Sequence, residues 1–164
     1  MTALITFSPG DDPTAAQWQT LRSIGAVKTA NENRISTSTM ADDAALRADY
    51  NTNATYRVSG LIIHNSSTAA DFKFQIADTG SVTLAKFSVL GVAVGGSTEI
   101  KQEGGIGFGF TGEGAGADRS LWITGVVIVG GTPGALKIQW AQNTSTASTT
   151  SVQAASFLIL DQVA

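Results

Sequence analysis

The chain has 164 residues, of which 43% are hydrophobic and only 14% are charged, and its formal net charge is −3. This charged fraction lies below the roughly 25% of an ordinary soluble domain, which suits a protein whose surface is largely covered by partners. The acidic balance and the scattered lysines and arginines argue against a nucleic-acid partner, which would require a basic stripe. The lack of cysteine excludes disulfides and thiolate metal sites.

The sequence does not indicate membrane insertion or secretion. No apolar run approaches the roughly 18 residues needed to cross a bilayer. The stretch 1–7 has neither the basic start nor the long apolar segment of a signal peptide. We therefore expect synthesis in a cytoplasm and no membrane partner.

Residues 1–25 are predicted to form an extended arm followed by one short helix. The arm begins with an apolar patch and is closed by a Pro-Gly turn. Asp12 then precedes a proline, which is the N-cap and first-turn arrangement of a helix. The helix is expected over 14–22, where apolar residues share one face.

From residue 26 to residue 164 we expect one all-β domain. Several segments alternate apolar and polar residues, as strands with one buried face do, and others are more continuously apolar. The expected strands lie at 56–64, 72–76, 82–94, 121–129, 136–142 and 157–160, and the segment 82–94 can hold one long strand or two strands broken near Gly91. Eight to ten strands with turns about every ten residues favour an antiparallel β-sandwich or a jelly-roll-like barrel.

No arrangement of side chains indicates an enzyme, a metal site or a cofactor. The only histidine, His64, lies on an apolar strand and is expected to be structural or exposed rather than catalytic. The carboxylates at 42–43 lack the alternating oxygen ligands of a calcium loop. No helix follows the glycine-rich segment 104–110, so it lacks the helix N-terminus that holds a phosphate. A hydrolase is the weakest interpretation because no acid/base pair is evident.

Two segments are predicted to supply contacts between subunits. The strand at 121–129 is apolar on both faces, which is typical of a strand that is buried on both sides or lies at a subunit contact. The segment 104–110 alternates apolar residues with glycine, which permits close approach of another backbone. The predicted interface residues are Phe108, Phe110, Leu121, Ile123 and Val127.

Short features follow one another in a fixed order along the β domain. They are Val27-Lys28-Thr29-Ala30-Asn31-Glu32, Ser36-Thr37-Ser38-Thr39 with Met40-Ala41-Asp42-Asp43-Ala44-Ala45-Leu46, Tyr56-Arg57-Val58-Ser59-Gly60, Ala70-Asp71-Phe72-Lys73-Phe74, Gly134-Ala135-Leu136-Lys137-Ile138-Gln139-Trp140-Ala141-Gln142 and Ala155-Ser156-Phe157-Leu158. In this order, over residues 26–160, the chain resembles the small β-sandwich virion proteins of tailed bacteriophages. Several of those are capsid decoration (cement) proteins.

The resemblance implies a non-enzymatic homotrimer on the outer surface of the capsid. Such a protein is made in the host cytoplasm, binds the major capsid protein and clamps neighbouring capsomers. The resemblance also implies that the N-terminal arm docks on the capsid. The residues in the corresponding place are Leu4, Ile5, Phe7, Trp18 and Leu21.

The alternative is a host-recognition module of a tail fibre or baseplate. Trp122 and Trp140 would then form a platform on which glycan rings stack. Two tryptophans on strands of a β protein are more often core or interface residues, so we rank decoration above glycan binding.

Overall fold

The computed structural model describes Asp12 and residues 23–163, and the described part consists of strands and loops without a helix. The strands are β1 (Ile24–Val27), β2 (Glu32–Arg34), β3 (Ala41–Tyr50), β4 (Thr55–Asn65), β5 (Phe72–Asp78), β6 (Val82–Val92), β7 (Thr98–Gly104), β8 (Gly109–Gly112), β9 (Asp118–Val129), β10 (Gly134–Gln142), β11 (Thr150–Val152) and β12 (Phe157–Gln162). The helix predicted over 14–22 lies outside the described residues.

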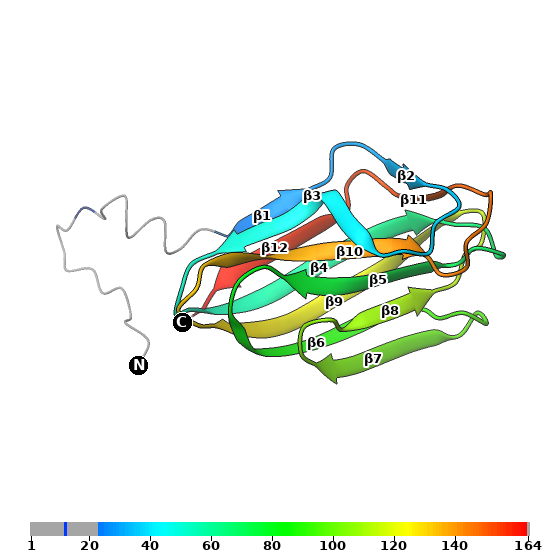
Figure 1. The fold of residues 1–164 in the computed structure, drawn as a ribbon. Coiled ribbons are helices and arrows are strands. Elements are labelled where there is room, and N and C mark those ends of the chain that lie inside the picture. The colour runs from blue at the N-terminus through cyan, green and yellow to red at the C-terminus, as the bar shows by residue number, and fades with distance from the viewer. Residues whose placement is uncertain (1–11, 13–22, 164) are drawn as a thin grey trace.

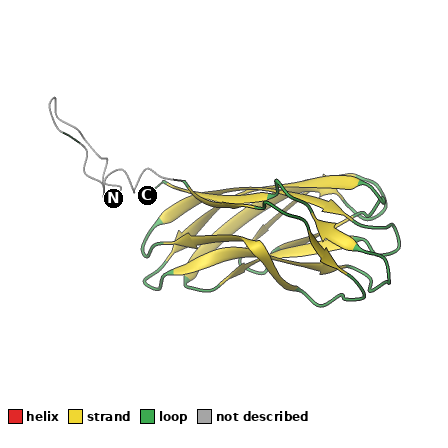
Figure 2. Ribbon diagram, turned by 90° about the horizontal axis from the view of Figure 1, so that it is seen from above, coloured by secondary structure: helices red, strands yellow, loops and turns green. Residues whose placement is uncertain are grey.

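The strands form two antiparallel sheets that pack face to face (Figures 1 and 2). The large sheet has the order β1-β12-β4-β9-β6-β7, and β11 pairs with both β4 and the short β2 at one end. The small sheet has the order β3-β10-β5-β8. The predicted all-β antiparallel sandwich is therefore confirmed.

The strand order makes this sandwich a jelly roll. Four hydrogen-bonded pairs, β1–β12, β3–β10, β4–β9 and β5–β8, lie one inside the next along the chain and alternate between the large and the small sheet. This is the pattern of a long hairpin rolled into two sheets. The β6–β7 hairpin is inserted between β5 and β8, and it extends the large sheet beyond β9.

All six strands expected from the sequence are present. The segment 82–94 is one strand to Val92 and runs through Gly91, where a Cβ atom would lie only 2.1 Å from Cδ2 of Leu121. The strand β3 was not expected, because its sequence Ala41-Asp42-Asp43-Ala44-Ala45 is short of large apolar residues.

The core fills the space between the sheets with the inward side chains of both. Its largest fully buried members include Trp140, Tyr56, Phe72 and Phe74. The Phe72 ring lies 5.9 Å from the Trp140 ring and 6.3 Å from the Phe74 ring, centroid to centroid. Burial of each such side chain stabilises the fold by about 1.5–3 kcal/mol, so the core holds the two sheets in a fixed relation.

Candidate functional site

The outer face of the large sheet carries a row of apolar side chains that crosses six strands. Directly opposite residues in an antiparallel pair share one face of the sheet. In sheet order the aligned residues are Val27, Phe157, Leu61, Trp122, Leu90 and Ile100, which we term the apolar row. Val27, Trp122 and Ile100 are 60%, 53% and 62% exposed. The row therefore presents large hydrocarbon groups to solvent.

A row of shorter side chains lies next to the apolar row. Ser59, Thr124 and Ser88 are aligned on β4, β9 and β6, two residues along from Leu61, Trp122 and Leu90. Because short side chains stand beside long ones, a shallow groove forms between the two rows. Its lining includes Ser59, Ser88, Leu90, Trp122, Thr124 and Phe157.

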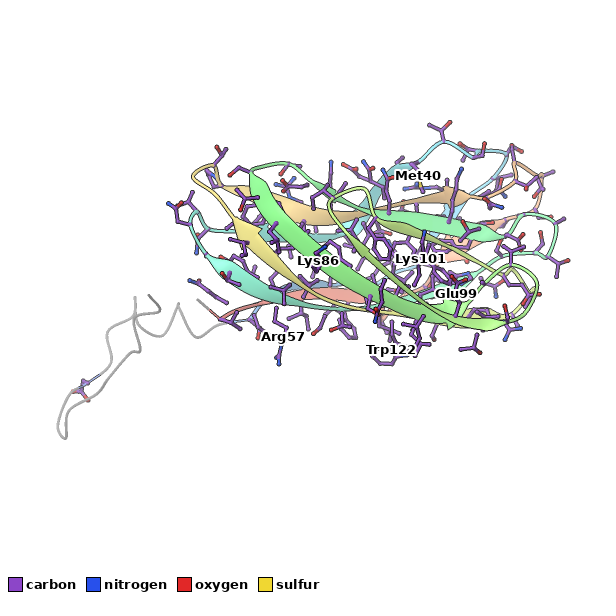
Figure 3. All side chains as sticks on the ribbon, turned by 90° about the horizontal axis from the view of Figure 1, so that it is seen from below. Met40, Arg57, Lys86, Glu99, Lys101 and Trp122 are labelled. Atoms are coloured by element: carbon purple, nitrogen blue, oxygen red, sulfur yellow. The ribbon has the colours of Figure 1, made fainter. Side chains whose placement is uncertain are left out.

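A third row brings charge to the same face. Arg57, Val126 and Lys86 are aligned on β4, β9 and β6, and Figure 3 shows Arg57 and Trp122 projecting from the same side of the molecule. The Arg57 guanidinium lies 2.6 Å from the Asp161 carboxylate. Hydrogen bonds from Ser23 and from Arg57 hold the pKa of Asp161 below its usual value.

The outer face of the small sheet is polar by contrast. Asp42 accepts hydrogen bonds there from Lys137 at 2.7 Å and from Gln139 at 2.6 Å. These two bonds lower the pKa of the Asp42 carboxyl. Lys73 and Gln75 continue the polar surface on β5.

The two faces differ most in their exposed apolar residues. Among the residues that the structure describes, eleven large apolar side chains are exposed, and seven of them lie on the outer face of the large sheet. The seven are Val27, Leu84, Leu90, Ile100, Trp122, Val126 and Ile128. Exposed apolar groups are therefore concentrated on this face, in the apolar row and around Val126, with the row of shorter side chains between them.

His64 is a core residue and is not exposed. Its ring is 1% exposed and stacks on Phe72 with the centroids 4.3 Å apart. Burial, and next the charge of Arg119, lower its pKa to about 4. Its Nδ1 atom has no hydrogen-bond partner among the described residues, so nothing there aligns the ring for proton transfer.

The residues predicted for the subunit interface do not face outward. Phe108, Phe110, Leu121, Ile123 and Val127 are all at most 4% exposed and belong to the core of their own chain. They cannot reach a second subunit without unfolding the first. On β9 the exposed residues are the alternate ones, Asp118, Ser120, Trp122, Thr124, Val126 and Ile128.

The two tryptophans proposed as a glycan platform do not share a surface. Trp140 is fully buried, and its Nε1 donates to the Asp43 carboxylate at 3.0 Å, so it cannot stack on a ligand. Trp122 alone is accessible.

The predicted arm residues Leu4, Ile5, Phe7, Trp18 and Leu21 lie outside the described residues. Within residues 23–163, no group of three or more histidines and carboxylates is placed to hold a metal ion. No helix in the described part of the chain is long and apolar enough to cross a membrane.

No protein-family model and no curated protein matches this sequence. Among solved structures, the chain overlaps the infectious bursal disease virus Gt strain structure with a TM-score of 0.24 and 12% identity. The overlap with the VP2 subviral particle of the same virus also has a TM-score of 0.24 and 12% identity. In both cases it covers 87% of this chain and 41% of the other, so this chain spans about two fifths of theirs. Similarity this low supports no functional conclusion.

Proposed function

We propose that this protein is a non-enzymatic virion protein, a capsid decoration protein of the tailed-bacteriophage kind. In this proposal its copies form a homotrimer through the outer face of the large sheet. The trimer binds the major capsid protein on the outside of the head, with the N-terminal arm as the docking segment. The order of sequence features in the β domain supports the location on the capsid.

The observation that carries the association is the one-sided surface of the jelly roll. The apolar row and the exposed residues Val126, Ile128 and Leu84 lie on one face, and the opposite face is polar. Removing such a face from water is favourable in proportion to the apolar area covered. In a trimer each copy would contact its two neighbours through different parts of this face, so apolar surface would meet apolar surface in every contact.

The outer face is also of suitable size. The face is roughly 24 Å wide across its six strands, which lie about 4.8 Å apart. It is roughly 20 Å long from residue 122 to residue 128, at about 3.3 Å per residue. Projecting side chains enlarge the accessible surface beyond this flat area of about 500 Å². A stable contact takes about 800 Å² from each partner, which this face approaches.

The capsid would gain stability by mass action. A protein that binds only the assembled shell stabilises it by about 2.7 kcal/mol per site at a hundredfold excess over the dissociation constant. Many symmetric copies add avidity, so each single contact need not be strong.

Sedimentation equilibrium of the full chain tests the association. We expect a trimer for the unmodified protein and a monomer for Ile100→Lys, because a lysine in the apolar row places a charge at the contact. Ile35→Lys is the matched control, since Ile35 is 54% exposed but lies outside the apolar row. A monomeric unmodified protein, or equal effects of the two substitutions, would contradict the proposed interface.

Immunogold electron microscopy of intact particles tests the location. Dense label over the head is the expected result. Label at the tail tip would favour host recognition instead, and particles without label would overturn the virion assignment.

The exposed Trp122 favours glycan binding as a second candidate function. Its ring borders a groove that also contains the hydroxyls of Ser59, Ser88 and Thr124, and a sugar ring could stack on it with its hydroxyls bonded below. Glycan-array binding that disappears in Trp122→Ala, with an unchanged far-ultraviolet circular dichroism spectrum and an unchanged melting temperature, would establish this function. No binding by the unmodified protein would exclude it for the glycans on the array.

A further inference from the structure

A buried amine and a buried carboxylate face each other at the edge of the sandwich, and neither side chain belongs to the apolar row. Lys28 follows β1 and is only 3% exposed. Its Nζ atom lies 2.8 and 2.9 Å from the two oxygens of Asp43 on β3, whose side chain is 0% exposed. The same Nζ lies 3.0 Å from Oε2 of Glu32 on β2.

The backbone holds the amine in this place. The Lys28 amide donates to the Ser156 carbonyl at 2.8 Å, and its carbonyl accepts from the Ala155 amide at 2.8 Å. The residue is thus tied to the loop before β12, and only its side chain turns inward. Because these two bonds fix the Lys28 backbone, its side chain is already oriented toward the Asp43 carboxylate.

The Asp43 carboxylate is held as firmly. Its Oδ1 accepts from the backbone amides of Ala45 and Leu46, both at 2.9 Å. Its Oδ2 accepts from Trp140 Nε1 at 3.0 Å. The two amides are fixed in the fold and point at Oδ1, on which negative charge would grow if the carbonyl carbon were attacked, whereas Trp140 points at the other oxygen.

Glu32 supplies a third group at the same place. Its Oε2 accepts from the Ala44 amide at 2.9 Å, and its Oε1 lies 2.8 Å from Arg34. Burial alone would raise the pKa of Glu32, but the hydrogen bonds from Ala44, Arg34 and Lys28 lower it to about 2. It is therefore an ionised carboxylate in direct contact with the amine.

From this geometry we propose that Lys28 and Asp43 condense into an intramolecular amide bond, with Glu32 as the proton carrier. The reaction begins when a proton passes from the Lys28 ammonium to the Asp43 carboxylate, which leaves a neutral amine and a neutral acid. The nitrogen lone pair then attacks Cγ, and the Ala45 and Leu46 amides stabilise the resulting oxyanion.

The remaining steps balance without any other reactant. The nitrogen, positively charged after the attack, gives a proton to Glu32. Glu32 returns that proton to the departing hydroxyl, the C–O bond breaks and one water leaves. The products are the amide, one water molecule and an unchanged Glu32 carboxylate. The Lys28 amine is already in contact with the Asp43 carboxyl group, since Nζ lies 2.8 and 2.9 Å from the two oxygens bonded to Cγ.

The bond would join the two layers of the sandwich covalently. Lys28 directly follows β1 of the large sheet, and Asp43 lies on β3 of the small sheet. It would close a covalent loop of the chain from Lys28 to Asp43. This inference does not depend on the proposed function.

Mass spectrometry of the purified full chain decides the question. The expected intact mass is that of the sequence less one water. After trypsin, we expect a branched peptide in which residues 23–34 are joined to residues 35–47, because an acylated Lys28 is not cleaved. Unlinked peptides ending at Lys28 would overturn the proposal, even if one water had been lost elsewhere in the chain.

Three variants separate the roles. Lys28→Arg keeps the ion pair but cannot form this amide, so its mass should be that of its sequence and its melting temperature should fall. Asp43→Ala should likewise stay linear. Glu32→Gln keeps both reactants, and we expect it to accumulate linear chain for far longer than the unmodified protein does. A fully cross-linked Glu32→Gln protein at the same time after synthesis would remove Glu32 from the mechanism.

Discussion

At the scale of single residues, the interior of this protein contains buried polar groups. The free energy of unfolding therefore depends on whether these groups are protonated and hydrogen-bonded. His64 is the clearest case, since it is the only histidine and lies against Phe72 in the core. Burial and the nearby charge of Arg119 disfavour the protonated ring relative to the neutral ring. The pKa of about 4 in the fold lies below the ordinary value of 6.5.

We expect stability to fall as the pH is lowered through this interval. The unfolded chain binds a proton at His64 below pH 6.5, whereas the folded chain stays neutral until about pH 4. Protons therefore favour unfolding, and the free energy of unfolding should drop by about 2 kcal/mol between pH 7.5 and pH 5. Urea unfolding at the two pH values measures this drop. His64→Leu should be less stable throughout but should lose most of this pH dependence; an undiminished dependence would mean that another group titrates.

The two tryptophans should respond differently to the same substitution. Trp140→Phe removes the Nε1 donor to buried Asp43, which should cost about 1–3 kcal/mol in the free energy of unfolding. The Arg34 guanidinium, 4.0 Å above the Trp140 ring, would also lose part of its partner. Trp122→Phe is the control, because it changes an exposed side chain and should stay within about 0.5 kcal/mol. Equal losses in urea unfolding would contradict the contrast.

At the scale of elements, alternation along each strand separates core from contact surface. On β9, Leu121, Ile123 and Val127 face inward, and Trp122, Val126 and Ile128 face outward. The sequence indicates that both sides of this strand are apolar, but it does not indicate which side faces the core. That choice depends on the small sheet, which covers only one side of β9.

Deletion of residues 1–11 should abolish capsid binding and leave the β domain folded. The reason is that the strands of the jelly roll begin at Ile24, so the described core has no member from the deleted segment. Co-sedimentation with particles measures binding, and thermal unfolding checks the fold. Full occupancy by the shortened chain would show that the arm is not the docking segment.

At the scale of the whole molecule, the sandwich has one polar and one apolar face. Few ion pairs lie on the apolar face, and the exposed Arg57–Asp161 pair is partly solvated and worth little. The proposed trimer would accordingly rest on hydrophobic contact rather than on charge.

The trimer should therefore tolerate salt and weaken in the cold. Screening acts on exposed charges, so raising the salt concentration from about 0.1 to about 1 M should not dissociate it, whereas hydrophobic association weakens on cooling. Sedimentation equilibrium over both ranges measures the two effects. Dissociation by salt alone would point to an electrostatic interface instead.

The sequence by itself determined that the chain is all-β and placed six of its strands. It could do so because alternation of apolar and polar residues is a local property of the backbone. The tertiary structure alone decided the jelly-roll order, the burial of Trp140 and the exposure of Trp122. It also aligned the apolar row and brought Lys28 to Asp43, fifteen positions away. These features depend on which strands pair and in which register, and pairing between distant segments leaves no periodic trace in one sequence.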